Sequence, residues 1–114
     1  DYTVAIAATP HVTKGAWKIN HFTDANIDET SGFSGYVLHF NPSGKITVRK
    51  NGKVITGNWS EDEILKRITI SLDTKDPVLT KLNDYWNIST ATGASVNFKN
   101  KENPSEGRLQ ITSL

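Results

Sequence analysis

The sequence predicts an all-β domain: an eight-stranded antiparallel up-and-down meander, closed into a small barrel, with one short helical turn near residues 77–83. Two observations carry this prediction. Residues 36–59 alternate as three strands joined by two tight turns, and both turns place the apolar side chains on one common face. Five further alternating segments flank this stretch, and eight strands are enough for a meander to close and lose its exposed edges.

The second turn of the central stretch is an Asn-Gly pair at residues 51–52. This pair accepts positive φ at both central positions of a type I′ hairpin, so it fixes the register of the two strands that it joins. Val48 should face Ile55, and Ile46 should face Gly57. The apolar face of this hairpin then points toward the predicted core.

The first turn has a different chemistry but leads to the same face. Residues 41–44 read Asn-Pro-Ser-Gly, which suits a type I turn with Pro at its second position and a left-handed Gly at its end. Counting back from this turn places Phe40 opposite Ile46 and Leu38 opposite Val48. The two registers therefore agree.

The chain before the central stretch contains an arm, a strand and a loop. Residues 1–13 are weakly patterned, and we expect them to form an N-terminal arm that lies on the barrel or caps one end. The barrel domain then spans residues 14–114. Its first strand should point Trp17, Ile19 and His21 inward and Lys18, Asn20 and Phe22 outward. The polar loop at residues 23–35 is long enough to lie over a barrel mouth.

The chain after the central stretch supplies the remaining strands. Residues 67–72 alternate as a half-buried strand. Asp76-Pro77 begins the helical turn, with Asp as the cap and Pro at the first helical position. Three more alternating strands follow this turn, at residues 85–89, 94–99 and 108–114.

Composition restricts the possible functions. The chain has 114 residues, no cysteine, and a net charge of +1 from 13 basic and 12 acidic side chains. One domain of this size buries a core without disulfides, and the balanced charge argues against a nucleic-acid partner. No apolar run approaches the roughly 20 residues that span a membrane. Because the chain also lacks methionine, we expect that a secretory signal, a lipoprotein leader or another segment precedes Asp1.

A resemblance to a known family lies in five stretches: Gly15-Ala16-Trp17, LHFNPSGKITVRKNGKVITGNWS, ITISL, LNDYWNIS and LQITSL. Together they resemble the small lipocalin-like, calycin-like barrels of exported Bacteroidetes proteins, from about residue 14 to the end of the chain. The resemblance implies a periplasmic, outer-membrane-anchored or secreted domain, often a lipoprotein with a lipid anchor upstream of Asp1. Arg108 is the candidate for the closing arginine that covers Trp17 in lipocalins.

The same resemblance implies a ligand site inside the barrel. Lipocalins hold one apolar ligand against an apolar lining. We therefore expect ligand contacts, at a mouth framed by residues 23–35, from Trp17, Tyr36, Phe40, Trp59, Trp86 and Phe98. The alternative is that these side chains simply fill the interior, because a small eight-stranded barrel is just wide enough to be filled by its own residues.

The sequence carries no signature of a catalytic site, a metal site or a cofactor. His11, His21 and His39 lie on different predicted elements, so they are not expected to share a metal. Residues 32–35 lack the spacing of a serine nucleophile elbow, and the acidic residues 61–63 lack that of a calcium loop. We expect a protein that is not an enzyme.

Two functions remain open. The first is a non-enzymatic domain of the cell envelope, or a secreted one, that binds a small apolar or amphipathic ligand at the barrel mouth. The alternative is a protein-interaction or inhibitor module that uses the N-terminal arm and loops, as some bacterial protease inhibitors with small lipocalin-like barrels do. Tight packing of residues 1–12 against their own barrel would argue against this alternative.

Overall fold

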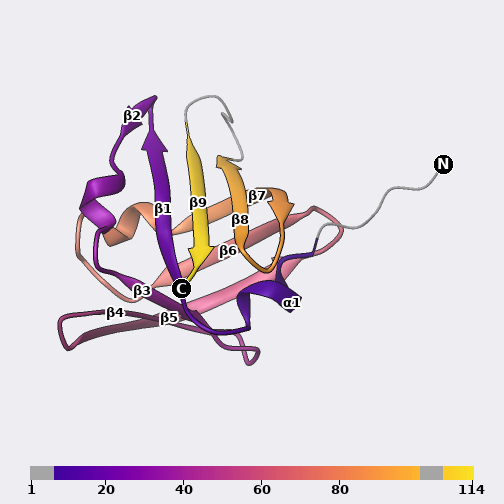
Figure 1. Ribbon diagram of the computed structural model, residues 1–114, viewed down its shortest axis with the longest axis horizontal. Helices are drawn as coiled ribbons and strands as arrows, with labels where there is room; N and C mark the ends of the chain where they lie inside the picture. Colours follow the sequence, from indigo (N-terminus) through magenta and orange to yellow (C-terminus); the bar gives the residue numbers. More distant parts are fainter. Residues whose placement is uncertain (1–6, 101–106) are drawn as a thin grey trace.

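The computed structural model describes residues 7–100 and 107–114 (Figure 1). The arm predicted at residues 1–13 is therefore described from residue 7 onward. In chain order the elements are α1 (Thr9–Val12), β1 (Trp17–Asp24), β2 (Ile27–Asp28), the 3-10 helix η1 (Thr30–Phe33), β3 (Val37–Phe40), β4 (Lys45–Lys50), β5 (Lys53–Asp62), β6 (Arg67–Leu72), the 3-10 helix η2 (Leu79–Leu82), β7 (Asp84–Ala91), β8 (Ser95–Asn100) and β9 (Arg108–Ser113).

The strands form a closed antiparallel barrel in meander order. The sheet runs β1-β3-β4-β5-β6-β7-β8-β9, and β9 pairs back onto β1. The short β2 adds to β1 outside this ring. Figure 1 shows β1, β9 and β8 as one wall of the barrel and β4 to β6 as the wall beneath. The predicted eight-stranded barrel is thus confirmed, and the helical turn predicted near residues 77–83 is the 3-10 helix η2; α1 and η1 are additional to the prediction.

Both predicted hairpin registers are confirmed. Val48 pairs with Ile55 and Ile46 with Gly57 across β4 and β5, while Phe40 pairs with Ile46 across β3 and β4. The turns have the expected backbone, with φ of 52° and 81° at residues 51 and 52 and 96° at Gly44. The apolar face built by these two turns forms one side of the core.

Aromatic side chains fill much of the interior. Those that are buried, each at most 7% exposed, are Trp17, Phe22, Phe33, Phe40, Trp59, Trp86 and Phe98. Tyr36, expected inside as well, is only half-buried and packs against the edge of this core. The Phe40 and Trp59 rings meet edge to face at 5.5 Å.

The inward prediction for His21 and the outward prediction for Phe22 are wrong, because β1 contains a β-bulge. Ile19 pairs with Ile111, but His21 pairs with the next residue of β9, Gln110. One extra residue in β1 reverses the alternation of the side chains that follow it. Phe22 therefore enters the core and His21 faces outward.

The expectation that Arg108 covers Trp17 is also wrong. Trp17 pairs with Ser113, whereas Arg108 pairs with Thr23 near the other end of β1. The indole nitrogen of Trp17 is buried and has no hydrogen-bond partner among the described residues. In the same buried cluster as Trp17 lie Ala8 and Val12 of the arm, each fully buried. Cover at this end of the barrel comes from the arm instead of an arginine.

Candidate functional site

The loop at residues 23–35 fills the end of the barrel that it was expected to frame. Phe33, from η1, is 1% exposed, and its ring lies 4.8 Å from that of Phe22. Phe22 in turn meets the Trp86 ring edge to face at 5.9 Å. The indole nitrogen of Trp86 donates a buried hydrogen bond to the Leu82 carbonyl of η2. Aromatic packing and two 3-10 helices therefore close this end.

A salt bridge joins the two segments that form this seal. The Nζ of Lys81, on η2, lies 2.7 Å from a carboxylate oxygen of Glu29, just before η1. The η2 turn is itself capped by Asp76, whose carboxylate accepts from the backbone N–H groups of Val78 and Leu79 at 2.8 and 3.2 Å. These two hydrogen bonds hold the pKa of Asp76 below its ordinary value.

The other end of the barrel is closed by the arm. The Glu61 carboxylate, on β5, accepts hydrogen bonds from the backbone N–H groups of Ala8 and Thr9 at 2.9 and 2.8 Å. It also accepts from the Thr9 hydroxyl at 2.6 Å. The described part of the arm is thus packed on its own barrel, which removes the motivation for an inhibitor arm at residues 7–12; residues 1–6 lie outside the described residues.

The six residues expected to bind a ligand are not gathered around one hollow. Trp59 lines a large groove on the outside of the barrel, Phe98 a smaller hollow on the opposite wall, and Tyr36 a third beside the 23–35 loop. The others, Trp17, Phe40 and Trp86, line none of these and pack in the core. A ligand role for the six stays a prediction.

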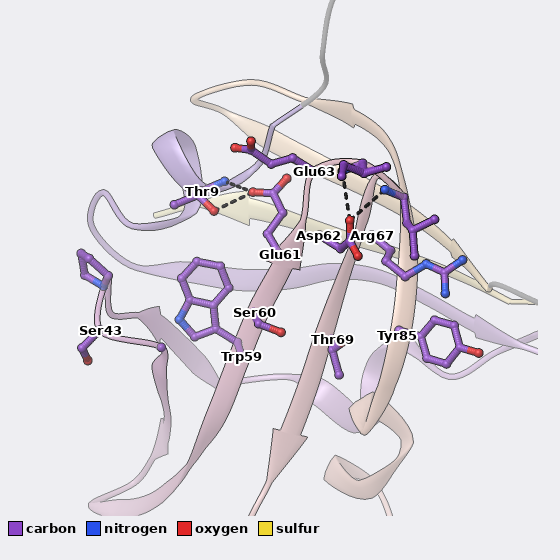
Figure 2. A pocket seen from close by; sticks show the side chains of 14 residues that line it. Thr9, Ser43, Trp59, Ser60, Glu61, Asp62, Glu63, Arg67, Thr69 and Tyr85 are labelled. Atoms are coloured by element: carbon purple, nitrogen blue, oxygen red, sulfur yellow. Dashed lines mark hydrogen bonds between the residues drawn. The ribbon is translucent and has the colours of Figure 1, made fainter.

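The large groove, which we call the outer groove, has a volume of about 960 Å³. Figure 2 shows Trp59 and Ser43 on one side of it, Arg67 and Tyr85 on the other, and Ser60 between them. Ser60 pairs with Thr69, and Thr69 with Tyr85, so the floor and one wall are a row across β5, β6 and β7. Because these three residues point outward from the sheet, their hydroxyl groups line the groove.

The rim of the outer groove is apolar and exposed. Ile64 and Leu65, in the β5–β6 turn, are 91% and 53% exposed. The Asp62 carboxylate accepts from the backbone N–H groups of both at 3.0 and 2.9 Å, which holds the turn in place (Figure 2). A left-handed Lys66, with φ of 56°, completes the turn. Two apolar side chains are therefore exposed to solvent at the edge of the outer groove.

The guanidinium of Arg67 stands in the wall of the outer groove. The Cζ of Arg67 lies 4.5 Å from the centre of the Tyr85 ring, a cation–π geometry. Its Nε is buried and donates to no described acceptor. Within residues 7–100 and 107–114 the ion pairs are Lys53–Asp76 and Lys81–Glu29, so Arg67 forms no salt bridge with a described carboxylate. Asp62 is its register partner on β5, and the Asp62 carboxylate accepts from the turn backbone instead. Stacking on Tyr85 orients the guanidinium in the wall of the groove.

Sequence reasoning missed the rim and the Arg67 wall. The stretch at residues 60–65 begins with polar and acidic residues and ends in an Ile-Leu pair. Two large apolar residues at a hairpin tip, where nothing in the meander covers them, were the available signal. The position of Arg67 over Tyr85 had no comparable signal, because it depends on the side-chain rotamers.

The described residues contain neither a candidate metal cluster nor a membrane-spanning helix. In the part of the chain that the structure describes, no group of three or more His, Cys, Asp and Glu side chains is placed to hold a metal ion. His11, His21 and His39 lie on α1, β1 and β3. None of the described helices has the length and hydropathy needed to cross a bilayer.

Comparison with known proteins shows the fold. No family model and no curated protein matches the sequence. Among solved structures, a DUF4847 family protein from Bacteroides vulgatus superposes with a TM-score of 0.69 at 11% identity, covering 92% of this chain and 96% of that one. A lipocalin-like protein from Bacteroides uniformis superposes with a TM-score of 0.64 at 14% identity, covering 90% and 98%. The lipocalin-like barrel that the sequence resembles is the fold of this chain.

Proposed function

We propose that this lipocalin-like barrel is a non-enzymatic binding domain of the bacterial cell envelope, or a secreted one, which holds a small amphipathic ligand in the outer groove. The observation that carries the proposal is the juxtaposition of exposed Ile64 and Leu65 with the Tyr85-stacked guanidinium of Arg67 at a hollow of about 960 Å³. Large concave hollows with a few convergent polar groups are where small ligands usually bind.

The outer groove replaces the barrel mouth as the proposed site. The mouth is packed by Phe22, Phe33 and Trp86, and the hollows of ligand size are lined by turns, loops and outward-facing strand residues. An apolar ligand in the interior would have to displace these rings. In the outer groove it displaces only water.

The groove suits a ligand with an apolar body and an acidic head. Burial of one exposed Leu or Ile side chain is worth roughly 1.5–3 kcal/mol, which an apolar body gains against Ile64 and Leu65. A guanidinium donates strong, charge-assisted hydrogen bonds to carboxylate, sulfonate or phosphate groups. Three carboxylates also line the groove: Glu61 and Asp62 accept hydrogen bonds from backbone N–H groups, which offset part of their charge, and Glu63 is exposed to solvent, which screens its charge.

The envelope location is inferred from the likeness to exported Bacteroidetes domains, and the absence of catalysis from the fold. Lipocalin-like barrels generally bind rather than catalyse. A lipid anchor upstream of Asp1 belongs to the same inference. Fractionation of cells that express the full-length protein tests the location directly: a protein found only in the cytosol would contradict it.

The binding proposal is tested with 8-anilinonaphthalene-1-sulfonate, which joins apolar rings to an acidic sulfonate. We expect saturable enhancement of its fluorescence by the folded protein. The double variant Ile64→Ser/Leu65→Ser should weaken binding at least about tenfold, because loss of one apolar contact of this size costs more than the 1.4 kcal/mol that equals tenfold. Arg67→Gln should weaken it several-fold.

Val54→Ser is the matched control, because Val54 is 51% exposed on β5, the strand that leads into the turn of Ile64 and Leu65, but does not line the outer groove. It should bind the probe as the wild type does. Since this dye also reports loosely packed states, each variant must keep the wild-type urea midpoint. No saturable binding, or equal binding by the rim variant, would overturn the proposal.

A further inference from the structure

A second hollow lies on the opposite wall of the barrel, and its chemistry differs from that of the outer groove. It has a volume of about 360 Å³ on the outer face of β7, β8, β9 and β1. The cationic and titratable side chains that line it are His21, Lys99 and Arg108. We propose that this hollow, which we call the basic hollow, binds a small oxyanion of the phosphate class.

Two like charges face each other across the strands of the basic hollow. Lys99 and Arg108 are direct register partners on β8 and β9. Like charges placed directly opposite each other destabilise a sheet. Neither forms an ion pair with a carboxylate in the described part of the chain. A bound dianion would neutralise both charges and so remove the repulsion between Lys99 and Arg108.

The β-bulge of β1 supplies the third group. Without the extra residue His21 would point into the core, as the simple alternation predicted. With it, His21 stands opposite Gln110 on the outer face and lines the basic hollow. A second bulge, in β7 between Ile88 and Thr90, borders the same hollow. Bulges commonly re-aim side chains beside functional sites.

The neutral groups of the basic hollow are oriented as donors. Asn20 Nδ2 donates to Gln110 Oε1 at 2.7 Å, which leaves the Gln110 amide N–H groups to donate. Asn97 Nδ2 donates to Thr90 Oγ1 at 2.8 Å, so the Thr90 hydroxyl keeps its own proton for another acceptor. The side-chain carbonyls of Asn20 and Asn97 remain as acceptors, and of these two residues only Asn97 lines the hollow. A donor-rich, cationic surface selects an acceptor-only ligand such as phosphate.

One carboxylate stands in the same row of the sheet. Asp28 pairs with Thr23, which pairs with Arg108, so a threonine separates the acid from the guanidinium. The Asp28 carboxylate accepts from the Thr30 backbone N–H at 2.9 Å, and its hydrogen bonds to Thr30 lower its pKa. Asp28 is thus engaged chiefly with its own loop, interacts electrostatically with His21 to a smaller extent, and does not line the basic hollow.

The test is a titration of the ¹⁵N-labelled chain with sodium phosphate, compared with sodium chloride at equal ionic strength. We expect saturable shifts of backbone amides in β8, β9 and the middle of β1, with side-chain amide shifts of Asn97 and Gln110. The dissociation constant should be millimolar or tighter. Sodium acetate, which offers a single charge, should bind more weakly, and equal binding would show a carboxylate site instead.

A charge-matched pair of variants separates a site from general attraction. Lys99→Gln/Arg108→Gln should weaken phosphate binding about tenfold or more, while Lys45→Gln/Arg49→Gln, which removes two exposed charges from β4, should leave it unchanged. Equal losses in both variants, or no saturable shift in the wild type, would overturn the inference. Because the rim of the outer groove contributes no residue here, this result and that of the dye titration are independent.

Discussion

The interior of the barrel and its outer face use aromatic and charged residues in opposite ways. Inside, the rings of Phe22, Phe33 and Trp86 pack against one another and close one end. Outside, Arg67 stacks on Tyr85 beside a groove and keeps its charge. The volume that a larger barrel of this kind offers to a ligand is occupied here by side chains. The difference is the reason why we place the proposed ligand site on the outer face of the barrel.

The largest expected effect comes from opening the interior. Phe33→Ala removes a ring that is 1% exposed and packed against Phe22, so we expect a loss of roughly 3–5 kcal/mol in the free energy of unfolding. Urea denaturation measures it. Ile64→Ala, at 91% exposure, should change stability by no more than about 0.5 kcal/mol. Similar small values for both variants would mean that the 23–35 loop does not seal the barrel.

The next effect concerns the strand whose outer face forms the floor of the groove. A Cβ added at Gly57 of β5 would collide with the Ser71 carbonyl and lie 2.7 Å from the Leu72 Cα. Gly57→Ala should therefore cost about 1–3 kcal/mol, because backbone must move. Gly93→Ala is the matched control, since nothing lies within 4 Å of its added Cβ. Equal midpoints in urea would show that β5 and β6 are less closely packed than described.

A somewhat smaller effect is expected at the end closed by the arm. Glu61→Ala removes the acceptor of three hydrogen bonds from residues 8 and 9, worth about 2 kcal/mol together with the fit of α1. Amide exchange of Ala8 and Thr9 should accelerate by more than that of the strands. Glu63→Ala removes an exposed acidic side chain nearby and should change neither the stability nor the amide exchange of Ala8 and Thr9. If exchange stays slow in Glu61→Ala, the burial of Ala8 and Val12 alone anchors the arm.

The smallest effect depends on pH and concerns the η2 seal. The folded state lowers the pKa of Asp76, chiefly through the N–H groups of Val78 and Leu79. The cap therefore adds stability above the ordinary pKa of an aspartate and loses it as the pH falls through the lower, folded-state value. Asp76→Ala should be less stable than wild type at pH 6, and the difference should vanish in strong acid. Asp73→Ala should show no such trend.

Much of the fold could be predicted from the sequence because its turns are chemically explicit. The Asn-Gly pair at residues 51–52 and the Asn-Pro-Ser-Gly turn at residues 41–44 each fix a register, and the alternation of the strands then identifies most of the core. The bulge at Asn20 could not be predicted, because the pairing of β1 with β9 closes the barrel between distant segments. Because of that single extra residue, Phe22 points into the core and His21 points outward.

The candidate sites were less predictable than the fold. Phe33 lies in a polar loop, and its burial depends on where η1 comes to rest against Phe22. The outer groove arises from a turn, a hairpin tip and the arm, which are distant in sequence. The sequence did point to Trp59, the one predicted ligand contact that lines this groove. Its partners there depend on tertiary placement rather than on a motif.

The three tryptophans offer the most direct test of a filled interior and an outer site. Their indole N–H signals report separate places: Trp59 lines the outer groove, while Trp17 and Trp86 lie in the core and line none of the hollows described above. During titration with 8-anilinonaphthalene-1-sulfonate, the Trp59 signal should shift with saturation and the other two should stay fixed. A shift of the Trp17 or Trp86 signal with Trp59 unchanged would place the ligand inside the barrel and contradict this account.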